Sequence, residues 1–199
     1  MFRNSFFSLL LMTAFMVLGA SSVSAQMQEF PVGNVMADFK LKDINGKEHS
    51  FNSLHGKNGT VLIFLSAQCP VVKMYDERVN KLAAEYAAKG INFVGINSNS
   101  TEGLDWVKSH AEANYKFPML IDPENKIADK LGALVTPEVY YFDTNNKLLY
   151  HGAIDNDRSG KNIKDNYLRV AFDSTLAGGK IERTKANAFG CTIKRVGME

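Results

Sequence analysis

One segment of the chain is apolar on both faces of the strand that it predicts. Thr60 to Leu65 reads Thr-Val-Leu-Ile-Phe-Leu, which is typical of a strand buried on both sides in a parallel sheet. From Val71 to Tyr86, apolar residues recur at spacings of three and four, which predicts an amphipathic helix that Gly90 ends. Ile91 to Ile96 then predicts a second buried strand. This strand–helix–strand order indicates a sheet covered by helices.

The remaining elements change character along the chain. Ala37 to Leu54 predicts a strand–turn–strand extension at the N-terminus, with Asn45-Gly46 at its turn. The other predicted elements are helices at Glu102 to Ala113, Asn125 to Leu131 and Asp165 to Ala177, and strands at Met119 to Ile121, Glu138 to Phe142 and Leu148 to Gly152. Strands alternate with helices in the first part of the chain, and an antiparallel hairpin followed by a helix comes after them. This order favours an α/β fold around a central mixed β-sheet. Trp106 and Phe117 are interpreted as core residues.

The first 25 residues predict a signal peptide. A short region with Arg3 precedes an uncharged run from Ser5 to Ala20, and Val23 and Ala25 occupy the recognition positions of a cleavage site. A membrane anchor is the alternative, but the apolar run is shorter than the about 20 residues that a membrane-spanning helix needs. We therefore expect cleavage near Ala25 and a periplasmic or secreted protein without a stable membrane anchor.

Residues 26–199 predict one domain, with a core at about 32–178 and a tail at 179–199 that carries Cys191. The chain has 23 Lys and Arg residues against 21 Asp and Glu residues and lacks a basic stripe, which argues against a nucleic-acid partner. Two cysteines in 199 residues exclude a disulfide-rich mini-scaffold and a four-cysteine zinc site. The four histidines are not spaced as metal ligands, so we predict no metal site.

Cys69 follows a predicted buried strand and directly precedes a predicted helix. Pro70 suits the first position of that helix, where a missing N–H costs nothing. Unpaired backbone N–H groups and the helix dipole favour the thiolate, which is the reactive form of cysteine. The alternative is an inert, half-buried thiol. In a protein outside the cytosol, the corner position favours a reactive cysteine.

Several motifs are similar to those of the thioredoxin-like redoxins. They are Phe64-Leu65-Ser66-Ala67-Gln68-Cys69-Pro70, Gly95-Ile96-Asn97-Ser98-Asn99, Leu131-Gly132-Ala133-Leu134-Val135-Thr136-Pro137-Glu138-Val139, His151-Gly152-Ala153-Ile154-Asp155 and Phe189-Gly190-Cys191-Thr192-Ile193. The chain most resembles the exported, peroxiredoxin-like branch of the alkyl hydroperoxide reductase/thiol-specific antioxidant family, from about Val32 to Arg195. The resemblance implies a thioredoxin-like fold.

The resemblance also implies roles for particular residues. Cys69 falls where the family places its nucleophilic cysteine. Thr136-Pro137 falls where thioredoxin folds place a cis-proline beside the reactive sulfur, with backbone offered to a bound partner. An ordinary trans, strand-opening turn is the alternative for this dipeptide. Glu138 either helps to select a partner or faces water.

The chain departs from both relevant family patterns. A thioredoxin-type Cys-x-x-Cys site needs a second cysteine where this chain has Val72. A peroxiredoxin site has proline where this chain has Leu62, and no arginine partner can be assigned. Ser66 does match the Ser/Thr position of that site, so it could donate a hydrogen bond to a peroxide oxygen or to a thiolate. It could equally bond to its own backbone.

Cys191, in the tail, leaves two interpretations open. It could resolve a sulfenic acid or mixed disulfide formed on Cys69, for which a flexible tail is suited. It could instead form a permanent structural disulfide with Cys69, closing a loop of more than 100 residues.

The leading hypothesis is an exported thiol–disulfide oxidoreductase that needs no bound cofactor. Cys69 attacks a disulfide on a partner protein, Cys191 displaces the product, and a separate reductant reopens the bridge. The first alternative is a thiol peroxidase that acts on a hydroperoxide. The second is a non-catalytic redoxin, either with a structural disulfide or as a copper(I) carrier that uses the two cysteines with Met74 or a histidine.

Overall fold

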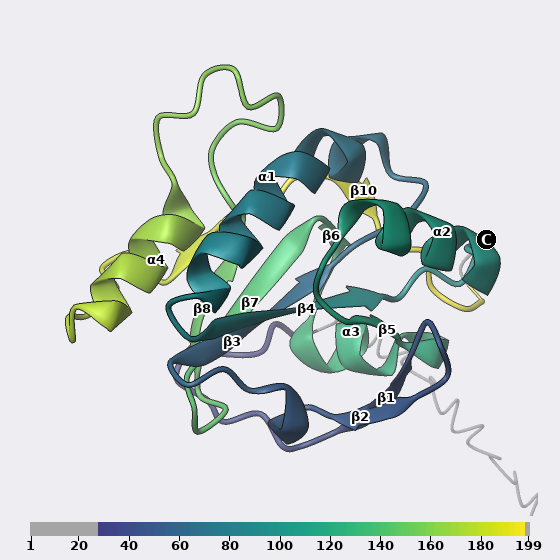
Figure 1. Cartoon of the computed structure of the whole chain (residues 1–199), viewed down its shortest axis with the longest axis horizontal. Helices are drawn as coiled ribbons and strands as arrows, with labels where there is room; N and C mark the ends of the chain where they lie inside the picture. The colour runs from purple at the N-terminus through teal and green to yellow at the C-terminus, as the bar shows by residue number, and fades with distance from the viewer. Residues whose placement is uncertain (1–27, 198–199) are drawn as a thin grey trace, which may run out of the picture.

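The computed structural model describes residues 28–197, so the predicted signal peptide lies outside the described residues. The main sheet has eight strands in the order β2-β1-β5-β4-β3-β7-β8-β9. These strands are β1 (Lys40–Asp43), β2 (Glu48–Ser50), β3 (Gly59–Phe64), β4 (Ile91–Asn97), β5 (Met119–Ile121), β7 (Glu138–Phe142), β8 (Leu148–Gly152) and β9 (Lys185–Ala186). The described chain is one mixed α/β unit (Figure 1).

Strand β3 lies inside the sheet, as its two apolar faces predict. All six of its residues are buried. It pairs in parallel with β4 and antiparallel with β7, so the sheet changes direction at this strand. The predicted central mixed sheet is confirmed.

Three helices cover one face of the sheet and one covers the other (Figure 1). The helices α1 (Pro70–Ala87), α2 (Leu104–Asn114) and α4 (Tyr167–Leu176) pack on the face to which β3 contributes Val61 and Ile63. The helix α3 (Lys126–Leu131) packs on the opposite face, against Leu62 and Phe64. Short 3-10 helices occupy Asn52–Leu54 and Pro123–Asn125. Alternate residues of β3 thus serve two separate apolar layers.

The N-terminal hairpin belongs to the main sheet. Its turn has Gly46 at φ 80°, in the left-handed region that favours glycine. Strand β1 pairs antiparallel with β2 on one side and with β5 on the other. The extension that the sequence predicts is therefore an edge of the central sheet.

The tail, which has little periodicity in sequence, forms two short strands. Strand β9 adds to the main sheet beside β8, and β10 (Cys191–Thr192) pairs antiparallel with β6 (Val135–Thr136). Just beyond β10, Ile193 is only 2% exposed and belongs to the core on the α3 side. The structure thus fixes the tail where the sequence suggested a flexible segment.

Trp106 is not a core residue, contrary to the prediction. It lies on α2 with 61% of its surface exposed, because α2 faces the sheet through Val107 and Ala111. Phe117 does pack against the core and stacks on Tyr115 at 4.9 Å between ring centroids. Helix α2 also begins at Leu104, two residues later than predicted.

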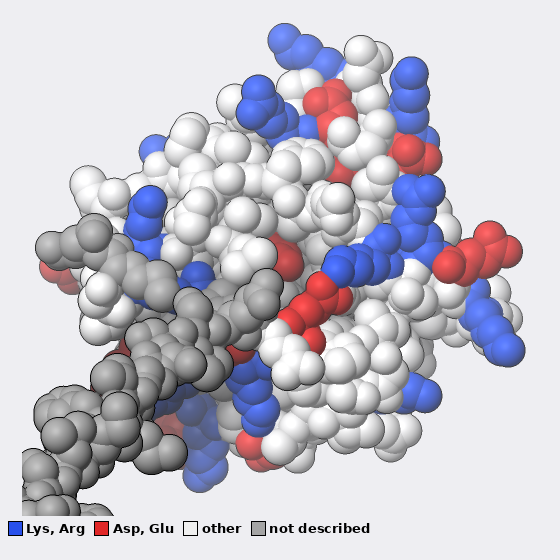
Figure 2. Space-filling view, turned by 180° about the vertical axis from the view of Figure 1, so that it is seen from behind, with Lys and Arg blue, Asp and Glu red and all other residues white. Residues whose placement is uncertain are grey.

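Basic and acidic side chains lie side by side on the face seen in Figure 2, in keeping with a formal charge of +2 for the whole chain. Within residues 28–197, the helices are all too short or too polar to cross a membrane.

Candidate active site

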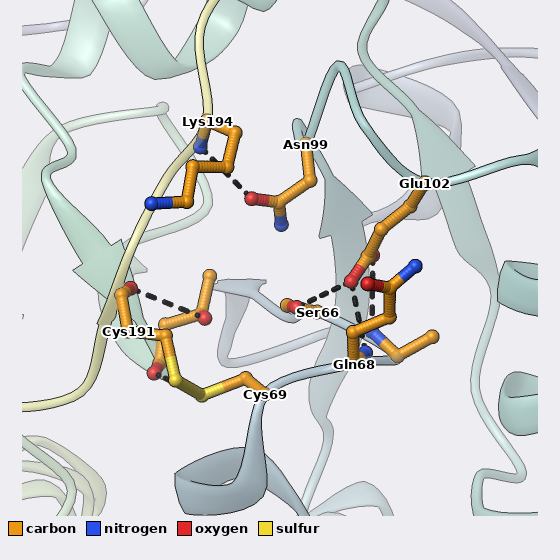
Figure 3. The surroundings of a disulfide bond; sticks show 9 residues. Ser66, Gln68, Cys69, Asn99, Glu102, Cys191 and Lys194 are labelled. Atoms are coloured by element: carbon orange, nitrogen blue, oxygen red, sulfur yellow. Dashed lines mark hydrogen bonds between the residues drawn. A yellow bond between two sulfur atoms is a disulfide. The ribbon is translucent and has the colours of Figure 1, made fainter. Parts of the chain in front are cut away.

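Cys69 and Cys191 form a disulfide, with 5.9 Å between their Cα atoms (Figure 3). Cys69 is the N-cap residue of α1, with extended backbone, and Pro70 opens the helix. Cys191 begins β10. The two residues are 122 positions apart, so only the fold brings their sulfur atoms together.

Cys69 lies at a buried corner between β3 and α1. Only 2% of the residue is exposed, and its Sγ lies 3.4 Å from the carbonyl oxygen of Thr136. Its amide donates to the carbonyl of Ser66 at 3.3 Å, which closes the turn before the helix. The positive end of the α1 dipole favours a negative charge on this sulfur once the bridge opens.

The Thr136–Pro137 peptide bond is cis, as the resemblance to thioredoxin folds implies. Thr136 is buried and lies directly opposite Cys191 in the β6–β10 pair. Its hydroxyl donates to the carbonyl of Cys191 at 3.5 Å. Next to this pair, a Cβ atom placed on Gly190 would lie 1.9 Å from the Thr136 carbonyl oxygen, so the tail approaches this closely only because residue 190 is glycine.

Ser66 lies in the loop before Cys69, 5% exposed. Its hydroxyl donates to Oε1 of Glu102 at 2.5 Å, so in the oxidised protein it is bonded neither to sulfur nor to its own backbone. The serine thereby helps to fix the loop that carries Cys69.

Glu102 is the residue that sequence analysis missed. Besides the Ser66 hydroxyl, its carboxylate accepts hydrogen bonds from the amides of Gln68 at 2.8 Å (Figure 3) and Ala67 at 3.0 Å. It also accepts from Nδ2 of Asn97 at 2.6 Å. The carboxylate thus fastens the segment before Cys69 to the loop after β4. An acidic residue at the predicted start of a helix gives no sign of this contact.

The same loop also holds the tail. Asn99 accepts a hydrogen bond from the amide of Lys194 at 2.9 Å (Figure 3). The Ser100 amide donates to the Lys194 carbonyl at 2.9 Å. Residues 97–102 therefore support both sulfur-bearing segments, one on each side of the disulfide.

Glu138 supports the loop before the cis-proline. Its carboxylate accepts from the amides of Leu134 at 2.9 Å and Val135 at 3.3 Å, and from the Tyr140 hydroxyl at 3.2 Å. Burial, together with the charge on Glu138, raises the pKa of Tyr140. Glu138 is 7% exposed, so the water-facing alternative is wrong.

Within residues 28–197, no group of three or more His, Cys, Asp and Glu side chains is placed to hold a metal ion. Met74, named in the copper(I) alternative, is 54% exposed on α1.

Arg78, also on α1, donates to the Asp155 carboxylate at 2.6 Å and to the carbonyls of Asp157 and Arg158.

Comparison with known proteins finds one matching family and several similar structures. The sequence model of the AhpC/TSA family matches residues 32–151. A solved structure of a hypothetical protein from Sinorhizobium meliloti is similar, with a TM-score of 0.78 and 32% identity, covering 85% of this chain and 97% of that one. Peroxidoxin BcpB from Mycobacterium tuberculosis shares the fold, with a TM-score of 0.59 and 24% identity over 74% of this chain and 96% of that one.

Among curated proteins, the thiol-disulfide oxidoreductase ResA from Geobacillus thermodenitrificans is 26% identical over 117 residues. The match covers 59% of this chain and 66% of that relative, just under two thirds of its length.

Proposed function

Since the chain belongs to the AhpC/TSA family, we propose that it is an exported thiol–disulfide oxidoreductase whose redox couple is Cys69–Cys191. The observation that carries the proposal is the disulfide itself. It joins the N-cap of a helix to a strand beside Thr136-Pro137, so one of its sulfurs is placed for stabilisation as a thiolate. The similarity to ResA, a protein named as a thiol-disulfide oxidoreductase, supports the same reaction class.

The reaction is a two-electron exchange with protein thiols. A partner with two thiols gives up two electrons and two protons, and the Cys69–Cys191 bond becomes two thiols. Of the two cysteines, Cys69 is the nucleophile, because the dipole of α1 lowers the free energy of its thiolate. Run in the opposite direction, the same steps reduce a disulfide on a partner, and a separate reductant then restores the thiols. The exchange needs no bound cofactor.

Export is supported by the sequence of residues 1–25 and by the disulfide. Disulfides persist in oxidising compartments outside the cytosol, and the glutathione and thioredoxin systems reduce them within it. A fusion of residues 1–25 to a reporter that is active only after export tests this part of the proposal. Residues 26–199 alone, fused to the same reporter, should give no activity.

Thiol peroxidase activity is the second candidate, because the family match is shared with peroxiredoxins. Two observations count against it. Leu62 is fully buried inside β3 at the place of the peroxiredoxin proline, and the Ser66 hydroxyl is bonded to Glu102. The chain therefore lacks the peroxiredoxin proline, and the Ser66 hydroxyl already donates to Glu102 and not to a peroxide oxygen in this arrangement.

Two assays on the reduced protein separate the candidates. We expect it to accelerate the reduction of insulin by dithiothreitol, and Cys69→Ser to abolish the acceleration. We expect hydrogen peroxide to oxidise Cys69 no faster than free cysteine in a rapid-mixing experiment. Fast peroxide consumption without insulin reduction would favour the peroxidase assignment over the oxidoreductase assignment. Inactivity in both assays would favour a structural role for the disulfide.

A further inference from the structure

The two sulfur-bearing residues differ in exposure. Cys69 is 2% exposed, enclosed by the β3–α1 corner and by the Thr136 carbonyl oxygen. Cys191 is only partly buried. Cys191 is therefore the more exposed residue of the pair.

The tail also fills the strand edge beside Cys69. Strand β10 occupies the side of β6 along which an extended partner segment would otherwise pair. The Ile193 amide continues this pairing by donating to the Leu134 carbonyl at 3.0 Å. A partner that approached Cys69 along β6 would first have to displace the tail.

The contacts that hold the tail do not depend on the disulfide. Ile193 is buried in the core, and Lys194 is bonded to the loop after β4 through Asn99. Arg195 donates to the Asp129 carboxylate at 2.8 Å and to the Ala133 carbonyl at 2.5 Å. On the other side of Cys191, Phe189 packs near the ring of Tyr75. Opening the bridge therefore leaves Cys191 in place over Cys69.

We propose that Cys191 is the sulfur that exchanges with the partner, and that Cys69 serves as the buried internal thiolate. The inference deepens the proposed oxidoreductase function and rests on it. It reverses the order that sequence analysis favours, in which Cys69 meets the partner first. The partner is a protein dithiol or disulfide that can reach a partly buried sulfur without entering the β3–α1 corner.

The exchange has two balanced steps. A partner thiolate attacks Sγ of Cys191, a bond forms between these two sulfurs, and the Cys69–Cys191 bond breaks with its electron pair on Cys69. The partner's second thiolate then attacks the partner's own sulfur in this mixed disulfide. Cys191 leaves as a thiolate and takes a proton from solvent, so the partner becomes a disulfide and the protein carries a thiol on Cys191 and a thiolate on Cys69. In the reverse direction, the Cys191 thiolate attacks the partner's disulfide and forms the mixed disulfide, and the Cys69 thiolate then attacks Sγ of Cys191 and expels the partner's thiolate.

Single-cysteine variants test the difference in access. Reduced Cys69→Ala and Cys191→Ala proteins are mixed with dithiobis-nitrobenzoate at about pH 9.5, about one unit above the pKa of an ordinary thiol, so that both thiols are ionised. We expect Cys191 in the first variant to react about tenfold faster than Cys69 in the second, because access now sets the rate. In guanidinium the two rates should converge. A Cys69 rate equal to or above the Cys191 rate in the folded proteins overturns the inference.

A second measurement uses the unaltered chain and does not depend on how the variants fold. The oxidised protein is incubated with glutathione, a monothiol, alkylated with excess N-ethylmaleimide at neutral pH, then acidified and mapped by mass spectrometry. We expect glutathione on Cys191 and maleimide on Cys69, and the opposite labelling overturns the inference. The proposed function is judged separately, by insulin reduction, so an active protein with glutathione on Cys69 would lose only the order of attack.

Discussion

Reducing the Cys69–Cys191 bond should lower the free energy of unfolding by about 5 kcal/mol. The bond closes a loop between residues 122 positions apart. In the chain-entropy model, a loop of this length removes about 16 cal/mol/K of entropy from the unfolded chain, which is about 5 kcal/mol at 25 °C. The folded state changes little, because the noncovalent contacts of Ile193 and Arg195 still hold the tail.

The same free energy must appear in the redox potential, because folding and bond formation complete one thermodynamic cycle. A bond that stabilises the fold by about 5 kcal/mol is harder to reduce in the folded chain than in the unfolded chain by the same amount. For two electrons, this corresponds to a potential about 100 mV more negative in the folded protein. The reduced protein would then be a better electron donor than its two cysteines are in the unfolded chain.

Urea denaturation of the oxidised and the dithiothreitol-reduced protein measures the stability difference directly. The double variant Cys69→Ala/Cys191→Ala is the control, and its stability should be the same with and without dithiothreitol. A separate titration with defined thiol/disulfide ratios, in the presence and absence of urea, measures the potential difference. A stability difference below about 1 kcal/mol would refute the argument, since the loop closed by the bond would then not constrain the unfolded chain as calculated.

Three further predictions concern residues around the site and on the α1 surface. Gly190→Ala should displace β10 and slow closure of the disulfide, which thiol alkylation measures as a slower gain of the oxidised form. Gly103→Ala is the control, because a Cβ there meets nothing within 4 Å, and it should not slow closure. Glu102→Gln should cost about 1–3 kcal/mol in urea unfolding, because an amide cannot accept at both of its atoms and leaves donors unpaired; unchanged stability would contradict the fastening role. Arg169 lowers the pKa of Glu85 to about 2, so the ion pair stabilises the fold above the ordinary pKa of 4.5 and is lost as pH falls through 2. Glu85→Gln should therefore lower the thermal midpoint at pH 7. The difference in midpoint between the variant and the unaltered protein should shrink at high salt and disappear near pH 2.

The core of the fold could be predicted from the sequence because its signals are local. The two apolar faces of β3 identify a strand inside the sheet, and the spacing of apolar residues in 71–86 identifies α1. Pro70 marks the first residue of that helix, and Gly90 lies three residues beyond its last residue, Ala87. Each signal lies within the element that it predicts or close to it.

The tail and its attachments could not be predicted in the same way. Strands β9 and β10 have two residues each, too few for an alternating pattern to appear, and their partners lie far away in the chain. The carboxylate of Glu102 meets groups 34 to 36 residues before it, which no local pattern encodes. A bulky apolar residue on a helix predicts burial, but Trp106 is exposed because α2 turns Val107 and Ala111 inward.

The support of both sulfurs by one loop bears on how the couple operates. In a Cys-x-x-Cys site the two sulfurs stay close because they are three residues apart in sequence. Here Glu102 holds the segment before Cys69 and Asn99 holds the segment after Cys191, and both belong to residues 97–102. When the bridge opens, these contacts keep the thiol and the thiolate near one another, so the bond can re-form as an intramolecular step with a high effective concentration. A change at Glu102 should therefore displace Cys69, and a change at Asn99 should displace Cys191. Either would slow closure of the bridge without altering the chemistry of the sulfur atoms.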